Sequence, residues 1–527
     1  MTRGLTPLTF LRRSAASRPG VCAVRDADGR EVTYLELLGR ADSLANAIRA
    51  EGIGPGDLVA VLAPNGLPAL EAHFGVPGSG AGLVALNTRL GPDEYAYILD
   101  HSRARLLIVD ESLADRVSGI VADRPALWKI VHNTSGQESP YEGWLAAAED
   151  SGGIQEPADE LQCITVNYTS GTTGRPKGVI YTHRGAYLNA LGSASAFDVR
   201  PESVFLWTLP MFHCNGWCLT WGVTAMGATH VCLPRPDPEA ALRAIAEHRV
   251  THLCGAPVVL SSLVSEAFST GVVFDPPVHA AVGGAPPSPS TITRAEASGM
   301  VVTHLYGMTE TYGPSLVCTP LPQWSGVGFE ERARLMARQG VPTVVVRGVR
   351  VLDDELRDVP RDALTMGEIV VDSETVMAGY LDDPDATEAV LRPEGLHTGD
   401  IAVMHPDGYI EIRDRAKDII ISGGENISSV EVEHVIAMHP AVAEVAVVAR
   451  PDETWGEVPV AFVHLSAGQT ATADELVALV RGRLAAFKAP KEVIFTELPK
   501  TATGKIRKGD LRRAVREEGA GSSHPSV

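Results

Sequence analysis

The sequence predicts an α/β fold with a large N-terminal domain of layered α/β subdomains, residues 1–416, and a small α+β C-terminal domain, residues 417–527. A chain of 527 residues that is 45% hydrophobic can bury the cores of more than two structural units. Up to residue 410, apolar strand-like runs alternate with longer helical patterns, which is typical of parallel sheets flanked by helices. From about residue 417 the pattern changes to that of a compact unit, so we place the domain boundary near 415–418.

The elements of the N-terminal domain follow one another closely. "DLVAVLAP" at 57–64 and "GLVALN" at 82–87 predict strands, and "GLPALEAHFGVPGSG" between them predicts a helix. Further on, the strand "CITVNY" at 163–168 precedes the loop "YTSGTTGRPKG" at 168–178, and the helical "HRGAYLNALGSASAF" at 183–197 follows it. We therefore expect the glycines of this loop on a tight turn between a strand and a helix.

The C-terminal domain is predicted from its strands and capped helices. "DIIISG" is a strand, and "SSVEVEHVIAMHP" is a helix that Ser428 opens, with Glu431 three residues later completing a capping box. "VAEVAVVAR" and "PVAFVHL" predict two more strands. The helix "ADELVALVRGRLAAF" and the basic helix "KGDLRRAVREE" complete the domain.

Composition restricts the partners and the compartment. The formal net charge of −20 argues against nucleic acid as a partner, because binding to a phosphate backbone needs a surplus of Lys and Arg. No window approaches 18 uninterrupted apolar residues, and the N-terminus lacks the apolar stretch of a signal peptide, so we expect no membrane span. Seven scattered cysteines and a C-terminus without a common address signal favour the cytoplasm.

The loop at 168–178 has the chemistry of a phosphate site. Backbone N–H groups at a glycine-rich turn after a strand point outward and can bind an anion. Four hydroxyl groups and the Lys177 ammonium add donors. The common spacing G-x-x-x-x-G-K-[ST] is absent, because Pro176 stands five residues after Gly171 and Lys177 is followed by Gly178.

The order of residues in this loop resembles the signature of the adenylate-forming superfamily, which contains acyl-CoA synthetases, adenylation domains of peptide synthetases and beetle luciferases. The other signatures stand in the same order: "GGAP" at 283–286, "YGMTE" at 306–310, "HTGD" at 397–400, "YIEIRDRAKDIIISGGENIS" at 409–428 and "PKTATGKI" at 499–506. The resemblance covers essentially the whole chain. "LPMFHCNGWC" at 209–218 and "GGENIS" are similar to segments of acyl-CoA synthetases that act on fatty or aryl acids.

The resemblance implies an AMP-forming acyl-CoA synthetase of fatty acid metabolism that uses ATP, Mg²⁺ and CoA. The carboxylate of a medium-chain fatty or aryl acid attacks the α-phosphate of ATP, giving acyl-AMP and pyrophosphate, and the CoA thiol then displaces AMP. Two alternatives stay open. In the first, the protein activates a non-carboxylate acid such as nitrite for N–N bond formation on an aryl amine; in the second, it transfers the acyl group of acyl-AMP to the phosphopantetheine arm of a carrier protein, releasing AMP. A homodimer is also left open.

The resemblance also implies which residues bind the nucleotide. Glu310 and Thr172 hold Mg²⁺, Thr309 contacts phosphate, and adenine lies against Tyr306 and the backbone of Gly284 and Ala285. Asp400 accepts the ribose hydroxyls, with Arg415 beside it. The remaining residues of the predicted ATP site are Thr169, Ser170, Gly171, Thr173, Gly174, Lys177, Pro286, Gly307, Met308 and Ile412.

Catalysis is expected from Lys505, Thr172, Glu310 and His213. Lys505 lies in the small domain and serves the first half-reaction, so this domain must rotate before CoA can react, and the resemblance places the hinge at Lys417. Gly423, Gly424, Trp455 and Lys488 are expected near CoA, with Lys491 in the same basic stretch. The acid pocket is predicted from His213, Trp217, Trp221, Gly283, Met308 and Tyr312.

Overall fold

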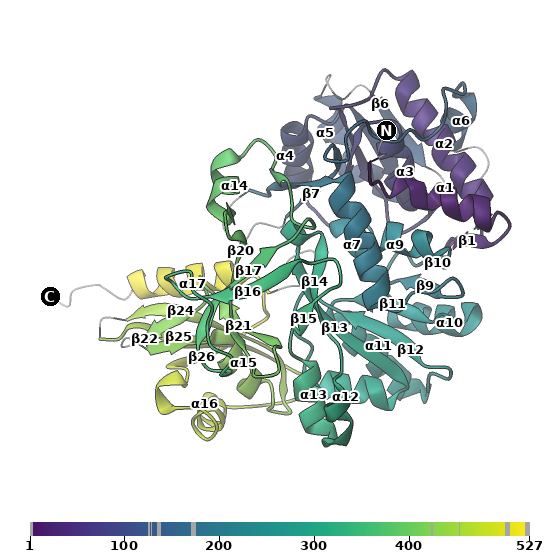
Figure 1. The fold of residues 1–527 in the computed structure, drawn as a ribbon. Coiled ribbons are helices and arrows are strands. Elements are labelled where there is room, and N and C mark those ends of the chain that lie inside the picture. The colour runs from purple at the N-terminus through teal and green to yellow at the C-terminus, as the bar shows by residue number, and fades with distance from the viewer. Residues whose placement is uncertain are drawn as a thin grey trace. The chain divides into compact units, whose positions relative to one another are not determined.

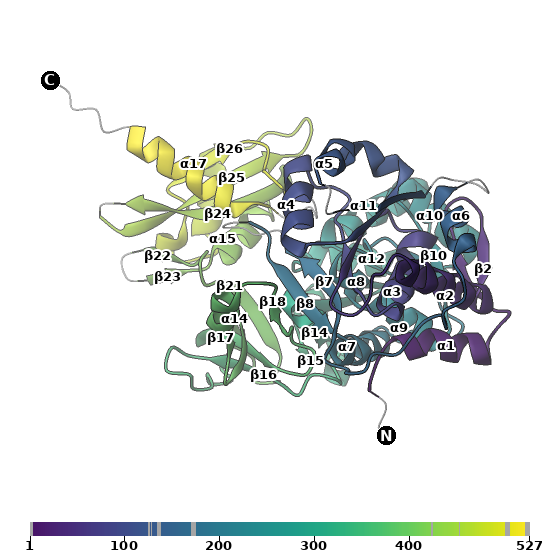
Figure 2. The same ribbon diagram turned by 90° about the horizontal axis from the view of Figure 1, so that it is seen from above.

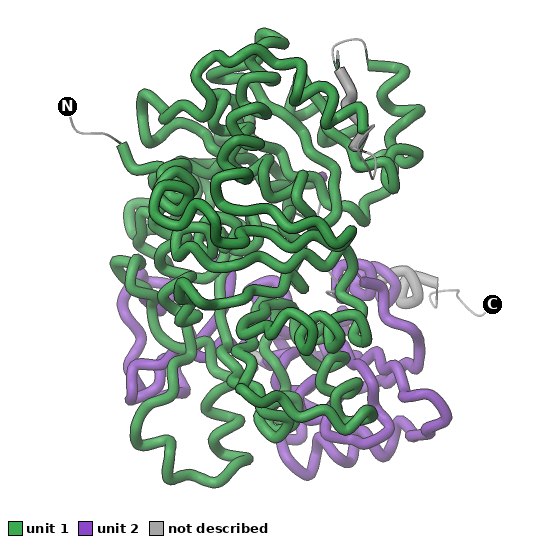
Figure 3. The backbone as a smooth tube through the Cα atoms, turned by 90° about the vertical axis from the view of Figure 1, so that its right-hand side faces the viewer, with its two compact units in different colours: residues 1–169, 176–349, 371–396 green, residues 170–175, 350–370, 397–527 purple. Residues whose placement is uncertain are grey.

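The computed structural model describes residues 4–124, 127, 129–133, 139–169, 175–422, 425–452, 454–500 and 506–521. The chain divides into two compact units, coloured in Figure 3: unit 1 contains residues 1–169, 176–349 and 371–396, and unit 2 contains residues 170–175, 350–370 and 397–527. The fold class is mixed α/β, as predicted. The predicted division at 416/417 falls inside unit 2 and stays a prediction.

Unit 1 contains a nine-stranded sheet that is parallel in its centre (Figure 1). Strands β13, β12, β11, β9, β10 and β1 run parallel, while β14, β15 and β2 are added antiparallel at the two ends. In spatial order the strands are β15 (Val341–Pro342), β14 (Gly313–Cys318), β13 (Met300–Met308), β12 (Val278–Val282), β11 (His252–Gly255), β9 (Val204–Trp207), β10 (Thr229–Cys232), β1 (Cys22–Arg25) and β2 (Glu31–Thr33).

A seven-stranded sheet forms the other layer of strands in unit 1. Its strands β7, β4, β3, β5 and β6 run parallel, and β8 and β18 are added antiparallel beyond β7. Their order is β18 (Gly379–Tyr380), β8 (Gly178–Thr182), β7 (Cys163–Tyr168), β4 (Gly82–Ala85), β3 (Leu58–Leu62), β5 (Leu106–Asp110) and β6 (Lys129–Asn133). Its apolar side chains, among them Leu62, Val84 and Leu107, form a continuous buried core with Tyr95 and Ile98.

Helices flank the sheets of unit 1, as the alternating pattern predicts (Figures 1 and 2). Helix α3 is buried almost all round, which is typical of a helix between packed layers. The helices are α1 (Leu8–Ser17), α2 (Tyr34–Ala50), α3 (Leu67–Gly78), α4 (Pro92–Ser102), α5 (Ser118–Ala122), α6 (Pro140–Ala147), α7 (His183–Ala196), α8 (Cys214–Trp217), α9 (Leu219–Met226), α10 (Pro238–His248), α11 (Pro257–Thr270), α12 (Pro289–Ala297), α13 (Phe329–Met336) and α14 (Pro384–Val390), with 3₁₀ turns at Glu111–Arg116, Thr309–Thr311 and Pro322–Gly326.

Unit 2 includes a sheet in which β16 (Gly348–Leu352), β17 (Met366–Asp372) and β20 (Gly395–Met404) are neighbours and β21 (Ile410–Arg415) pairs antiparallel with β20. The short β19 (Leu391–Arg392) pairs with the first residues of β20, which belong to unit 1.

The second sheet of unit 2 contains β23 (Glu425–Ile427), β22 (Ile420–Ser422), β25 (Gly456–Leu465), β24 (Val442–Asp452) and β26 (Glu492–Phe495). Alternate residues of β24 face two separate cores. Val445 and Val447 pack with α15 (Ser429–Ile436) and α16 (Ala473–Arg481), whereas Ala446 and Val448 pack with α17 (Lys508–Gly521). A 3₁₀ turn, Ala486–Lys488, follows α16.

Most predicted elements of the C-terminal part are confirmed. Ser428 caps α15 by accepting a hydrogen bond from the Glu431 backbone N–H at 3.1 Å. The Glu431 side chain pairs with Lys488 at 2.5 Å instead of returning to the Ser428 N–H, so the predicted capping box is only half formed. Helix α16 ends at Arg481, earlier than predicted, because Gly482 follows there. Across the ranges given above, no helix is long and apolar enough to span a membrane.

Candidate functional site

The ends of the predicted phosphate loop are held together in unit 1. The Thr169 N–H donates to the Lys177 carbonyl at 3.0 Å, and the Lys177 N–H donates to the Thr169 hydroxyl at 3.4 Å. Ser170, Gly171, Thr172, Thr173 and Gly174 lie outside the described residues, so nothing here tests their predicted roles.

The prediction that this loop joins a strand to a helix is wrong. The loop joins the antiparallel strands β7 and β8, and α7 begins only after β8, with Thr182 as its N-cap. Four of the five residues "GVIYT" of β8 are β-branched or aromatic, a composition that favours a strand. This strand was not predicted from the sequence. The loop is therefore a hairpin loop.

The "YGMTE" segment lies at the end of β13, where Tyr306 is buried and Glu310 is 7% exposed. Met308 and Thr309 are half-buried beside them. The Glu310 carboxylate accepts a hydrogen bond from the Tyr380 hydroxyl at 2.7 Å, and the Lys177 ammonium lies 4.6 Å from the centroid of the same tyrosine ring. Tyr380 was not predicted from the sequence, because its segment "GYLDDPDAT" at 379–387 belongs to none of the family signatures given above.

The "GGAP" segment follows β12, the parallel neighbour of β13. Gly284 has φ +87°, a left-handed conformation that glycine adopts without strain, and Gly284 and Ala285 are exposed. Pro286 is half-buried. At Gly307, a Cβ atom would lie 1.8 Å from the Gly313 carbonyl oxygen, so the two strands approach closely there. The carboxyl ends of two neighbouring parallel strands thus carry both predicted adenine segments.

The segment after His213, which includes α8, is not a right-handed helix but a left-handed turn. Cys214, Asn215, Gly216, Trp217 and Cys218 all have φ between +50° and +60°. A left-handed helix costs roughly 1–2 kcal/mol per non-glycine residue, so the surroundings must stabilise this turn. Its backbone is closed by hydrogen bonds from Gly216 N–H to the His213 carbonyl at 2.9 Å and from Cys218 N–H to the Cys214 carbonyl at 3.0 Å. Sequence patterns gave no signal for this conformation.

Side chains attach the turn to two of the predicted nucleotide segments of unit 1. The Asn167 amide, on β7 just before the phosphate loop, donates to the Asn215 side chain at 2.8 Å. The Cys214 thiol lies 3.6 Å from the Thr309 hydroxyl, and the Cys218 thiol contacts the Tyr312 carbonyl at 3.4 Å. The turn therefore contacts the strand that enters the loop and the "YGMTE" segment at once.

The residues predicted for the acid pocket separate into two groups. The Trp217 indole lies against the backbone of Gly283 and Gly313, and His213, four positions earlier in the chain, is half-buried. Trp221 is completely buried, and its N–H donates to the His73 carbonyl at 2.9 Å. Its contacts are those of a packing residue.

Tyr312 is also completely buried. Its ring stacks on Tyr181 at 3.8 Å, and its hydroxyl accepts from the Thr182 N–H at 2.6 Å. Burial raises the pKa of this phenol. Gly185 touches the same ring, so the side chain is occupied by packing. The places of Trp221 and Tyr312 in the acid pocket gain no support from these contacts.

In unit 2, the predicted ribose residues are paired. Asp400 on β20 lies opposite Arg415 on β21, and the Arg415 Nε is 2.7 Å from an Asp400 carboxylate oxygen. Ile412 lies on the same strand as Arg415. Glu368, which the sequence did not single out, accepts from the Gly399 N–H at 2.8 Å and contacts His397 at 2.6 Å, and so fixes the "HTGD" segment before Asp400.

The predicted hinge residue Lys417 follows β21. Partial burial and the positive charges of Arg415 and Arg512 lower its pKa, while Asp400 acts in the opposite direction. The two guanidinium groups repel the Lys417 ammonium, and this repulsion is smaller when the ammonium loses its proton or lies in solvent.

Two of the residues predicted near CoA are described. Trp455 is 49% exposed, and the Lys491 ammonium lies 5.8 Å from its ring centroid. Lys488 instead pairs with Glu431 and lies 6.0 Å from the Phe487 ring. Gly423 and Gly424 lie outside the described residues, as does Lys505, whose segment is flanked by a β-bridge between Lys500 and Ile506.

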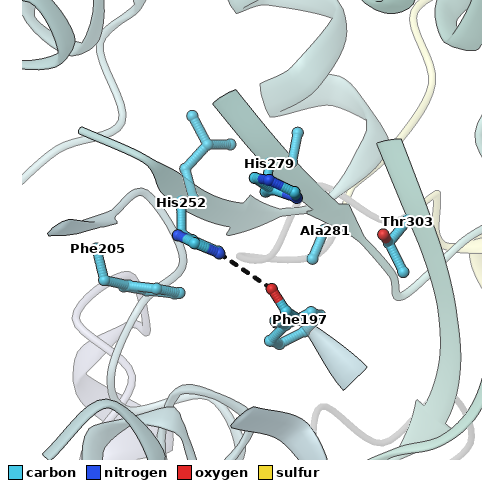
Figure 4. A pocket seen from close by; sticks show the side chains of 8 residues that line it. Phe197, Phe205, His252, His279, Ala281 and Thr303 are labelled. Carbon is cyan, nitrogen blue, oxygen red and sulfur yellow. Dashed lines mark hydrogen bonds between the residues drawn. The ribbon is translucent and has the colours of Figure 1, made fainter. Parts of the chain in front are cut away.

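A small pocket lies within the nine-stranded sheet and involves none of the predicted site residues (Figure 4). His252 and His279 stack there at 4.8 Å, and His252 Nε2 contacts the Phe197 carbonyl at 3.0 Å. Burial and the neighbouring His279 lower the pKa of His252 to about 4.

The fold is that of an α/β protein whose two predicted adenine segments lie at neighbouring strand ends, beside the buried carboxylate of Glu310. The chain belongs to the AMP-binding enzyme family: the model described as "AMP-binding enzyme" matches residues 11–381, and that of its C-terminal domain matches residues 431–505. The predicted family resemblance is thereby confirmed.

Full-length relatives are similar to this chain. An acetate–CoA ligase of Humulus lupulus is 43% identical, covering 98% of this chain and 95% of the relative. A peroxisomal acetate/butyrate–CoA ligase of Arabidopsis thaliana is 44% identical with the same coverage. The crystal structure of the anthranilate CoA ligase AuaEII with anthranoyl-AMP superposes with a TM-score of 0.87 at 26% identity, covering 99% of both chains.

Proposed function

We propose that this protein is an AMP-forming ligase that joins a short-chain carboxylic acid to CoA. In the first half-reaction the acid's carboxylate attacks the α-phosphate of ATP, releasing pyrophosphate and forming acyl-AMP. In the second, the CoA thiol attacks the acyl carbon and AMP leaves. The relatives support the reaction type, since two CoA ligases match the chain over nearly their whole lengths.

The contact of Trp217 with Gly283 carries the proposal for a short acid. The indole ring, 5% exposed, occupies the space beside the "GGAP" segment that the acyl group is expected to approach. A rigid aromatic ring at that place shortens the pocket, because well-packed interiors adjust little. Acetate and butyrate, which the two relatives are named for, are of the size that such a pocket accepts. The acid proposed is thus smaller than the medium-chain or aryl acid expected from sequence.

The residues of unit 1 fit MgATP. Glu310 is a buried carboxylate with one oxygen already hydrogen-bonded, and a carboxylate of this kind suits a hard cation bound together with nucleotide phosphates. Mg²⁺ would supply neutralisation of phosphate charge. Thr169, Lys177 and the residues between them are proposed to bind the β- and γ-phosphates, Thr309 to contact phosphate, and Tyr306 with Gly284 and Ala285 to bind adenine.

The residues of unit 2 are proposed to complete the reaction. Asp400 accepts the ribose hydroxyls, and the ion pair with Arg415 at 2.7 Å orients that carboxylate. Lys505 stabilises charge on the α-phosphate during adenylation, Lys417 is the hinge, and exposed Trp455 with Lys491 contacts CoA.

A panel of acids tests this proposal. Acetate, propanoate, butyrate, 2-methylpropanoate, hexanoate, octanoate, benzoate, cinnamate and nitrite would each be assayed for pyrophosphate release with ATP and Mg²⁺, then for CoA thioester by mass spectrometry. We expect the highest kcat/KM for a two- to four-carbon acid, with thioester formed in proportion to pyrophosphate.

Other results assign other functions. If kcat/KM is highest for octanoate or cinnamate, the proposal of a short pocket is wrong. If nitrite is the one compound of the panel that causes pyrophosphate release, the protein activates a non-carboxylate acid. Pyrophosphate release without thioester indicates a carrier protein or an amine as acceptor. The cytoplasmic location, the homodimer and a place in fatty acid metabolism stay predictions, and several relatives are named as peroxisomal.

A further inference from the structure

Tyr380 contacts two charged residues of the proposed phosphate and metal site. Its hydroxyl donates to the Glu310 Oε1 at 2.7 Å, and its ring lies under the Lys177 ammonium at 4.6 Å from the centroid. All three residues belong to unit 1. They come from three separate segments of the sequence, so only folding brings them together.

The backbone fixes Tyr380 beside the phosphate loop. Strand β18 pairs antiparallel with β8, the strand that leaves the loop, so that Tyr380 lies opposite Val179. The Leu381 N–H donates to the Gly178 carbonyl at 2.7 Å, one residue from Lys177. The Met377 N–H donates to the Glu310 carbonyl at 2.8 Å. The segment around Tyr380 is therefore joined to both partners through main-chain bonds.

The tyrosine hydroxyl determines how the Glu310 carboxylate is oriented. Glu310 is buried, and a buried carboxylate needs hydrogen-bond donors. The bond from Tyr380 occupies Oε1, and among the described residues no hydrogen bond to Oε2 is present. Oε2 is thereby left for a cation, while the carboxylate cannot rotate freely.

The tyrosine ring acts on the loop lysine. A cation over an aromatic face is attracted to it, and Asp383 at 4.0 Å adds a weak ion pair on the exposed side. Asp383 itself caps α14 through the Ala386 N–H at 3.1 Å. The long Lys177 side chain is thus held near one place instead of moving through many rotamers, which lowers the entropy lost when phosphate binds.

We propose that Tyr380 is a positioning residue that orients Glu310 toward Mg²⁺ and Lys177 toward the phosphates of ATP. The inference rests on the proposed function, since it takes Glu310 as the metal ligand. It assigns separate tasks to the two parts of one side chain: the hydroxyl acts on the metal and the ring acts on the lysine.

The variants Tyr380→Phe and Tyr380→Leu separate these tasks. ATP binding to the full-length protein would be measured by equilibrium dialysis while Mg²⁺ is varied, and pyrophosphate release would be measured in parallel. We expect Tyr380→Phe to raise the Mg²⁺ concentration for half-maximal binding about tenfold, the scale of losing a hydrogen bond to a charged group, with ATP affinity at saturating Mg²⁺ nearly unchanged. Tyr380→Leu should in addition weaken ATP binding at saturating Mg²⁺.

Tyr95→Phe is the matched control. It also removes one hydroxyl hydrogen bond from unit 1, the 2.8 Å bond to the Asn87 carbonyl, but at α4. If Tyr380→Phe only lowered the stability of the protein, it would behave like Tyr95→Phe, and neither variant would change the Mg²⁺ concentration for half-maximal ATP binding. In a Glu310→Gln background, Tyr380→Phe should have no further effect on the midpoint, because its effect passes through the carboxylate.

The outcomes are distinct. An unchanged Mg²⁺ midpoint in Tyr380→Phe, or a full additional shift in the Glu310→Gln background, overturns the inference. If the wild-type protein binds ATP in a Mg²⁺-dependent manner but none of the acids in the panel causes pyrophosphate release, the proposed function fails. The dialysis comparison still decides the role of Tyr380.

Discussion

The indole ring of Trp217 lies against the backbone of Gly283. A Cβ atom at Gly283 would lie 3.1 Å from Cη2 and 3.2 Å from Cζ2 of this ring. The tryptophan comes from the left-handed turn and the glycine follows the end of β12, so their contact joins the predicted acid segment to a predicted adenine segment. The size of the acid should therefore depend on this one side chain.

Removing the ring should lengthen the pocket. We expect Trp217→Ala to raise kcat/KM for hexanoate relative to butyrate by about tenfold or more, since each methylene accommodated in an apolar pocket changes binding by roughly 1–3 kcal/mol. The measurement is pyrophosphate release with a series of straight-chain acids. Trp221→Phe serves as control, because Trp221 packs on His73 and should not change the order of preference. An unchanged preference in Trp217→Ala would contradict the proposed pocket.

The left-handed turn should tolerate no side chain at Gly216. A Cβ atom there would lie 2.3 Å from Cζ3 of Trp207, at a φ of +60°. We expect Gly216→Ala to lower the free energy of unfolding by about 2–5 kcal/mol, from overpacking and left-handed strain together. Gly271→Ala is the matched control: its φ is +72° but nothing lies within 4 Å, so only the strain of about 1 kcal/mol remains. Equal losses in urea denaturation would show that the contact with Trp207 is unimportant.

Lys505 should serve one half-reaction only. We expect Lys505→Ala to slow adenylation by on the order of 10²–10³ or more, the effect of losing one preorganised charge, while thioester formation from supplied acyl-AMP largely survives. The two halves would be assayed separately, by pyrophosphate release and by thioester mass. Lys500→Ala is a suitable control, because Lys500 pairs with Glu444 at 2.7 Å and is not a predicted catalytic residue. Equal losses of rate in both half-reactions would contradict the proposed rotation of the small domain about Lys417.

The stacked His252 in Figure 4 should make stability depend on pH. Its pKa is lowered from 6.5 to about 4 in the folded protein, so between these values the unfolded chain binds more protons. The free energy of unfolding should therefore fall as the pH is lowered from 6.5 to 4, with about 3 kcal/mol due to this residue. Denaturation of wild type and His252→Asn at several pH values measures the difference. Parallel pH curves would argue against this role of His252.

Several features of the fold could be predicted from the sequence, because they depend on local patterns. Ser428 as a helix cap and the strands around "DIIISG" and "VAEVAVVAR" follow from spacing over a few residues. The proximity of Arg415 to Asp400 was also expected, and the structure adds that the two side chains form an ion pair. The hairpin at β7 and β8 was missed, since five residues of strand between a loop and a helix give too short a pattern.

The residues that the sequence did not reveal act through contacts between distant segments. Tyr380 reaches Glu310 from 70 positions away in the chain, and Asn167 reaches Asn215 from 48 positions away. No periodicity or short motif records such contacts. The same holds for Trp221 and Tyr312, which look like pocket residues in sequence and are buried by packing in the structure.

By itself, the sequence determined the fold class, the family and the order of the predicted nucleotide segments, because these depend on local patterns and on motifs whose spacing follows the chain. Only the tertiary structure decided that five successive residues after His213 turn left-handed, that Trp217 lies on Gly283, and that Tyr380 joins Glu310 to Lys177. These features depend on side-chain packing and burial across the fold, which overrule local backbone preference.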